Sequence, residues 1–111
     1  MHAIAEKLKQ RFQDRLAGEM EHAYIEGLDA DVYWKPLTGR QMKQIVKAEE
    51  KSKVEMVCTH VKLRALDEKG EPIFKDIPIV GLMNDFDFED LAEIYLAMTG
   101  VEHTVDELEK N

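Results

Sequence analysis

The stretch NDFDFED comes closest in this chain to a metal-binding motif. Asp85, Asp87 and Glu89 alternate along it like the first oxygen ligands of a calcium loop. Such a loop needs glycine at its sixth position and a bidentate glutamate at its twelfth, where this chain has Asp90 and Leu96. We therefore favour helix capping, because carboxylates at a helix start accept hydrogen bonds from free backbone N–H groups and offset the positive helix end.

Histidine and cysteine form no recognisable catalytic motif in the sequence. Glu19 and His22 are three residues apart, but two ligands without further partners do not define a metal site. Cys58 lies on the apolar side of a predicted helix, where a free cysteine is typically a small buried hydrophobe. The chain also lacks a glycine-rich phosphate loop. We expect no enzyme, no metal and no cofactor. The four histidines are scattered at His2, His22, His60 and His103.

Composition indicates one globular domain. The 111 residues are 44% hydrophobic and 34% charged, which is enough apolar content for a core and argues against disorder. The apolar runs are too short for a transmembrane helix, and the N-terminus lacks the apolar region of a secretory signal. A single cysteine cannot form an internal disulfide. These features predict a cytosolic protein.

Charge is distributed unevenly along the chain, whose overall net charge is −8. Residues 1–18 carry net +2, 19–33 carry −5, 34–66 carry +5 and 67–111 carry −10. The acidic total argues against broad nucleic-acid or membrane binding. The segregation predicts neutralisation within the domain or head-to-tail contacts between copies. The candidate self-association residues are Arg40, Lys43, Lys47, Lys62, Arg64, Asp85, Asp87, Glu89, Asp90 and Glu93.

The N-terminal third predicts a helix followed by a β-hairpin. Apolar residues recur every four positions over residues 3–17, and Gly18 is a suitable helix stop. This narrow apolar stripe predicts a helix that packs loosely or docks on another chain. Residues 20–36 are rich in β-formers, with a turn expected at 29–31. The stripe consists of Ile4, Leu8, Phe12 and Leu16.

The remaining chain predicts helices with clear start signals. Thr38 with Gln41, and Ser52 with Glu55, are capping boxes, so the sequence allows two helices or one long helix with a polar middle. Residues 67–72 predict a turn, and Asp87 caps a helix that Gly100 closes.

Thr104 with Glu107 predicts a further short helix over residues 105–110. The fold class is α+β: a predominantly helical single domain with a small N-terminal β-hairpin, in which residues 1–18 form a helix and 19–111 the main body. Trp34 is expected at the surface. The methionines in or beside apolar runs are expected to fill the core, namely Met42, Met56, Met83 and Met98.

The order of motifs resembles the tail assembly chaperones of long-tailed bacteriophages. Residues 31–41 read DVYWKPLTGRQ, residues 65–74 read ALDEKGEPIF, and residues 87–100 read DFEDLAEIYLAMTG. In that family an extended segment ends in a similar Pro-Leu-Thr stretch, followed by a helix, an Asp-Glu-Gly-Pro turn and a late acidic-apolar helix. The similarity covers about residues 31–100 and leaves the N-terminal helix outside the family pattern.

The resemblance implies a non-catalytic chaperone in the host cytoplasm that is absent from the mature virion. Such proteins bind the long helical tape measure protein, keep it soluble and self-associate, with the tail tube protein as a further partner. Covering exposed apolar helix faces removes aggregation-prone surface. The resemblance also implies a longer, frameshifted form. The ending Glu109-Lys110-Asn111 can be encoded by GAA AAA AAC, which contains a slippery heptamer.

Two other function classes stay open at the level of sequence. An acidic inhibitor or DNA mimic that binds a host nucleic-acid enzyme suits the net charge of −8, but not the basic middle segment. A small enzyme or metal-dependent domain would need clustered histidines and carboxylates, whereas the histidines here are scattered.

Overall fold

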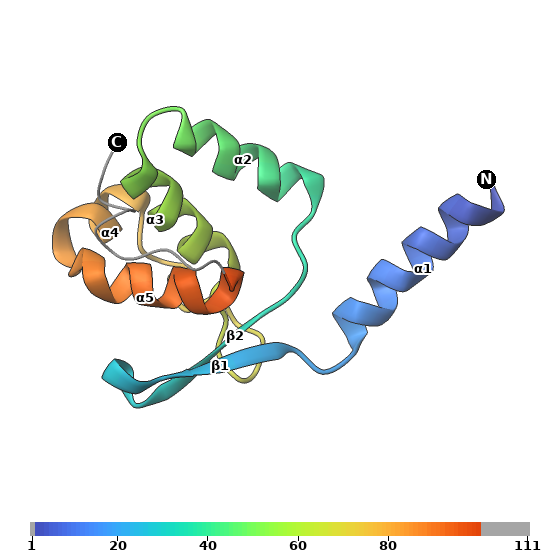
Figure 1. Ribbon diagram of the computed structural model, residues 1–111, viewed down its shortest axis with the longest axis horizontal. Helices are drawn as coiled ribbons and strands as arrows, with labels where there is room; N and C mark the ends of the chain where they lie inside the picture. Colours follow the sequence, from blue (N-terminus) through green and yellow to red (C-terminus); the bar gives the residue numbers. More distant parts are fainter. Residues whose placement is uncertain (1, 101–111) are drawn as a thin grey trace.

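The computed structural model describes residues 2–100, which form a predominantly helical α+β fold with a two-stranded antiparallel hairpin near the N-terminus (Figure 1). The expected fold class is therefore confirmed. The expected helix over 105–110, with its cap at Thr104, lies outside the described residues. The elements are α1 (Ala3–Ala17), β1 (Glu21–Ile25), the 3₁₀ turn η1 (Glu26–Leu28), β2 (Ala30–Trp34), α2 (Gly39–Glu49), α3 (Lys53–Arg64), α4 (Ile79–Asp85) and α5 (Phe88–Thr99).

The hairpin pairs Glu21 with Trp34 at one end and Ile25 with Ala30 at the other. Its strands are joined by η1 and by Asp29, whose φ of 49° is left-handed. The expected turn at residues 29–31 is placed too far toward the C-terminus. The turn is formed by η1 and Asp29, and Ala30 and Asp31 already belong to β2. Asp29 supplies the left-handed backbone that an aspartate tolerates at the end of such a turn.

The capping signals at Thr38 and Ser52 each begin a separate helix. The Thr38 hydroxyl accepts from the Gln41 amide at 3.2 Å, while the Gln41 side chain accepts from the Thr38 amide at 2.9 Å. The Ser52 hydroxyl accepts from the Glu55 amide at 3.0 Å. The sequence allowed two helices or one long helix, and the structure has two, α2 and α3.

Helix α5 has its caps at the two residues expected from the sequence, Asp87 and Gly100. The Asp87 carboxylate accepts from the Glu89 amide at 2.8 Å, so the acidic NDFDFED stretch caps a helix. Gly100 closes the helix with φ 65°, and its amide donates to the Leu96 carbonyl at 3.0 Å. Helix α4 was not expected, since Pro78 precedes it without any side-chain cap.

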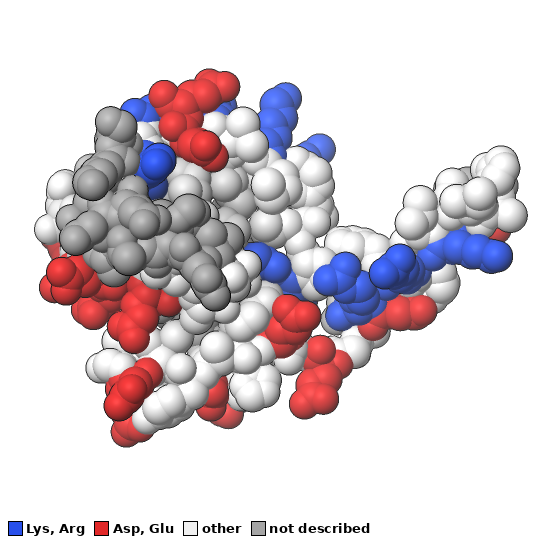
Figure 2. All heavy atoms as spheres, in the orientation of Figure 1, with Lys and Arg blue, Asp and Glu red and all other residues white. Residues whose placement is uncertain are grey.

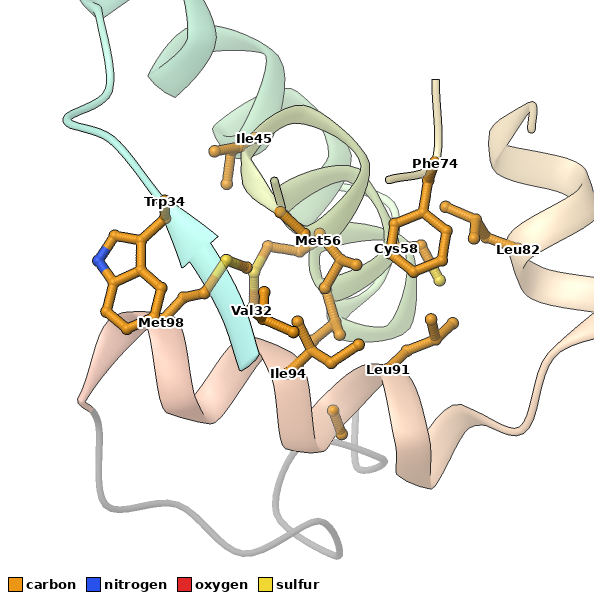
Figure 3. Packing of buried hydrophobic residues seen from close by; sticks show 14 of the residues in the cluster. Val32, Trp34, Ile45, Met56, Cys58, Phe74, Leu82, Leu91, Ile94 and Met98 are labelled. Carbon is orange, nitrogen blue, oxygen red and sulfur yellow. The ribbon is translucent and has the colours of Figure 1, made fainter. Parts of the chain in front are cut away.

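The core lies where α2, α3, α4, α5 and the inner face of the hairpin meet (Figure 3). Met56 and Met98 lie in it as expected, but Met42 and Met83 are 43% and 41% exposed, so core filling is wrong for those two. Trp34 is only 7% exposed, which corrects the expectation of a surface tryptophan. The largest of the fully buried side chains are Leu82, Leu91, Val57, Val61 and Cys58.

Helix α1 extends away from this body (Figure 1) and contributes no buried residue. Ile4 and Leu8 are 62% and 60% exposed, while Phe12 and Leu16 are half-buried nearer the body. The projection gives the molecule extents of 46 × 32 × 29 Å. Within residues 2–100, none of the helices is long and apolar enough to cross a bilayer.

Candidate binding groove

An apolar groove of about 350 Å³ lies where the C-terminal half of α1 approaches the body. We call it the α1 groove. Phe12 and Leu16 form its α1 side, and the segment after β2 forms part of the opposite side. Its volume is at the lower end of the range of ligand pockets in proteins. The lining residues are Phe12, Leu16, Lys35, Pro36, Leu37, Thr38, Gln41, Leu63, Arg64, Leu66, Gly70 and Pro72.

Backbone pairing fixes one side of the α1 groove. Leu66 donates its amide to the Tyr33 carbonyl at 2.8 Å and accepts from the Tyr33 amide at 2.9 Å. Leu66 also forms a bridge with Pro72, so the segment after α3 lies beside β2. These bonds hold the Leu66 and Pro72 side of the groove to the hairpin. The α1 side has no buried residue to hold it in the same way.

Cationic side chains border the α1 groove. The Arg64 guanidinium is half-buried and donates through Nε to the Lys35 carbonyl at 3.0 Å. Burial lowers the pKa of Arg64, an effect that the Glu21 carboxylate opposes and Arg15 reinforces. Lys35 and Arg64 also line a smaller adjoining pocket of about 190 Å³, whose other charged lining residues are Arg15, Glu19 and Glu21. The charged residues that line the α1 groove itself are the cations Lys35 and Arg64, so the groove favours a ligand that carries carboxylates beside its apolar contacts.

The apolar surface continues beyond the groove along α1. Ile4 and Leu8 extend the row begun by Phe12 and Leu16, at the four-residue spacing that places helix residues on neighbouring turns. Helix α2, whose N-cap residue Thr38 lines the groove, carries exposed apolar side chains of its own at Met42 and Val46. An amphipathic helix is the type of ligand that binds such elongated apolar surfaces.

The candidate self-association residues fall into three groups. Arg40, Lys43 and Lys47 are exposed on α2. The five acidic candidates are exposed on α4, on α5 and between them, and Figure 2 shows acidic side chains gathered over this end of the molecule. No ion pair joins these acidic residues to the basic candidates within residues 2–100.

Lys62 and Arg64 form the third group, because both have partners within the chain. Lys62 donates through Nζ to the carbonyl oxygens of Phe74 at 3.2 Å and Lys75 at 3.4 Å, and also to that of Ile77. Arg64 is bonded to the Lys35 carbonyl, as described above. These two cations hold loops on the body, whereas the three on α2 point to solvent.

The buried titratable side chains of α3 lie in the core and not in the groove. Cys58 is fully buried, as expected, and burial raises the pKa of its thiol. His60 is 6% exposed and meets the Tyr95 ring edge-on, with centroids 5.1 Å apart. Burial, assisted by Arg64, lowers the His60 pKa to about 4, so its imidazole is neutral at physiological pH.

Sequence reasoning identified the α1 stripe but missed the opposite side of the groove. Leu37, Leu63, Leu66 and Pro72 come from separate segments, and no local pattern connects them. Among the described residues, no group of three or more histidine, cysteine, aspartate or glutamate side chains could hold a metal ion. Comparison with protein-family models, with curated proteins and with solved structures gives no match.

Proposed function

We propose that this chain is a non-catalytic tail assembly chaperone of a long-tailed bacteriophage, which binds helical segments of the tape measure protein in the α1 groove. The observation that carries the proposal is the apolar groove together with the uncovered apolar row of α1. The order of motifs over residues 31–100 supports the choice of family. The protein would act in the host cytoplasm, self-associate and leave before the virion is mature.

The chemistry of the α1 groove supports an amphipathic helix as the ligand. Helix-in-groove recognition uses apolar anchors at positions i, i+3, i+4 and i+7 of the bound helix. The leucine and proline side chains of the groove would receive such anchors, while Lys35 would meet an acidic residue at the edge of the bound helix. Burial of these faces would prevent a long helical protein from aggregating before the tail tube encloses it.

Co-expression with the tape measure protein encoded in the same genome tests this function. We expect wild-type protein to increase the soluble fraction of the tape measure protein severalfold. The double variant Phe12→Ser/Leu16→Ser should lose most of that effect, and it should keep the body folded because α1 contributes no buried residue. The matched control is Leu28→Ser, at an exposed position on the hairpin turn outside the groove.

The outcomes separate the function from the site. If wild-type protein leaves the solubility of the tape measure protein unchanged, the proposed function is wrong. If the groove variant works as well as wild type, the α1 groove is not the binding site. The circular dichroism spectra of both variants should match that of wild type, apart from the helical signal that α1 contributes.

A further inference from the structure

The two ends of the molecule differ in charge. Figure 2 shows Lys and Arg side chains over α1 at one end of the long axis, and Asp and Glu side chains over α4 and the start of α5 at the other. Helix α1 carries four cations and two carboxylates. Residues 76–93 carry six carboxylates, all exposed, and neither lysine nor arginine. The six are Asp76, Asp85, Asp87, Glu89, Asp90 and Glu93.

Helix α1 presents an apolar row with a basic row beside it. Ile4 and Leu8 form the outer, exposed part of the apolar row. Lys7, Arg11 and Arg15 are exposed at the same four-residue spacing, so they form a parallel row on a neighbouring face. A helix of fifteen residues is marginally stable in water unless its apolar face packs on something. The outer half of α1 therefore needs a covering surface.

The opposite end of the molecule offers apolar side chains among the carboxylates. Val80 is 61% exposed, Met83 is 41% exposed and Phe86 is 39% exposed. Val80 and Met83 are three residues apart on α4 and so share one side of that helix. Phe86 follows directly, with its ring edge-on to Phe74 at 5.9 Å. We call Val80, Met83 and Phe86, with the neighbouring carboxylates, the α4 face.

We propose that α1 of one copy docks on the α4 face of a second copy. Ile4 and Leu8 pack on Val80 and Met83, and the basic row of α1 meets the carboxylates of residues 76–93. Both apolar content and charge are complementary between these two surfaces. The same chain cannot make this contact with itself, because α1 and α4 lie at opposite ends of a molecule 46 Å long.

The contact joins two different surfaces and is therefore heterologous. Each docked pair still has one free α1 and one free α4 face, so further copies can add. The assembly then either closes into a ring or grows as an open filament. This interface does not use Lys62 and Arg64, whose donors are bonded to backbone carbonyls of their own chain. It also leaves the groove side chains Phe12 and Leu16 available for a different ligand.

Sedimentation velocity on two surface variants and their mixture tests the docking. Ile4→Glu/Leu8→Glu removes the α1 contact, and Val80→Glu/Met83→Glu removes the α4 contact; all four side chains are more than two-fifths exposed. Wild type should form multimers at low salt, whereas each variant alone should be monomeric, with association weakened by about tenfold or more. An equimolar mixture should give a species of two copies, because each variant keeps the surface that the other lacks.

Several results would overturn the docking. Wild type could remain monomeric at low salt and high concentration, or either variant alone could associate as strongly as wild type. The equimolar mixture could stay monomeric, or the α4 variant could still dimerise through paired α1 helices. Recruitment of monomeric wild type to anionic phosphatidylserine vesicles would instead assign α1 to a membrane surface. Leu28→Glu is the control and should associate like wild type. The tape measure protein is absent from these measurements, so their result is independent of the proposed function.

Discussion

The indole Nε1 of Trp34 donates a hydrogen bond to the Glu21 carboxylate at 2.8 Å. The two residues face each other at the open end of the hairpin, where β1 starts and β2 ends. Trp34 packs in the core and also lines the pocket beside the α1 groove. This bond therefore connects the core to the point where the chain leaves for α1.

Replacing Glu21 should destabilise the fold through this bond. Glu21→Ala leaves the largely buried indole N–H without its acceptor, which costs about 1–2 kcal/mol of unfolding free energy. Glu21→Gln retains an accepting oxygen and should recover most of that loss. Urea denaturation measures both effects. Glu26→Ala, at an exposed position in η1, should change stability by less than about 0.5 kcal/mol, and equal losses in all three variants would refute the role of the bond.

Lys62 should act as a structural cation. Lys62→Met keeps the apolar stem but removes the ammonium that binds the carbonyls of Phe74 and Ile77, at a cost of about 1–2 kcal/mol. Hydrogen exchange should show faster exchange of the Ile77 amide, which donates to the Phe74 carbonyl at 3.1 Å. Lys47→Met, at an exposed position on α2, is the control. Unchanged exchange at Ile77 would contradict the assignment.

Two glycines with open surroundings should respond to alanine in opposite directions. A Cβ at either Gly39 or Gly100 would meet nothing within 4 Å, so backbone conformation decides the effect. Gly100→Ala forces a left-handed φ of 65° on an L-residue and should cost about 1 kcal/mol. Gly39→Ala, at the first residue of α2, should stabilise by about 0.5 kcal/mol. Thermal denaturation measures the change in melting temperature of both variants. A change in the same direction for both would contradict the argument from backbone conformation.

His60 should make stability depend on pH in the mildly acidic range. Its pKa is about 4 in the folded chain and 6.5 in the unfolded chain, so the unfolded chain binds the proton more readily. Stability is therefore complete above pH 6.5 and falls as the pH drops toward 4, by up to about 3 kcal/mol. Denaturation midpoints of wild type and His60→Leu, measured from pH 7 to pH 4, should show this slope in wild type alone. If wild type and His60→Leu lose stability equally as the pH falls, His60 is not the group responsible.

The elements with strong local signals were predictable from the sequence, and α4 was not. Side-chain caps at Thr38, Ser52 and Asp87 identified three helix starts, and Gly100 identified one helix end. Helix α4 has only seven residues and no side-chain cap, so it carries no comparable local signal. Its stability comes from packing, as Leu82 is fully buried in the core.

Tertiary contacts decided what the sequence could not. Trp34 was expected at the surface, but the hairpin lies against α5 and places the indole in the core near Met98 (Figure 3). Lys62 and Arg64 are among the self-association residues expected from the sequence, although both bind backbone carbonyls of their own chain more than ten residues away. The α1 groove likewise depends on segments that meet only in the folded chain.

Measuring the binding of a tape measure helix tests the central claim most directly. Isothermal titration of the purified chain with an amphipathic, acidic-flanked segment of the tape measure protein should give saturable binding. The negative heat-capacity change of apolar burial should accompany it. Phe12→Ser/Leu16→Ser should weaken that binding about tenfold or more, while Leu28→Ser leaves it unchanged. No binding by wild type to any tape measure segment, in the presence of correctly folded protein, would contradict the account.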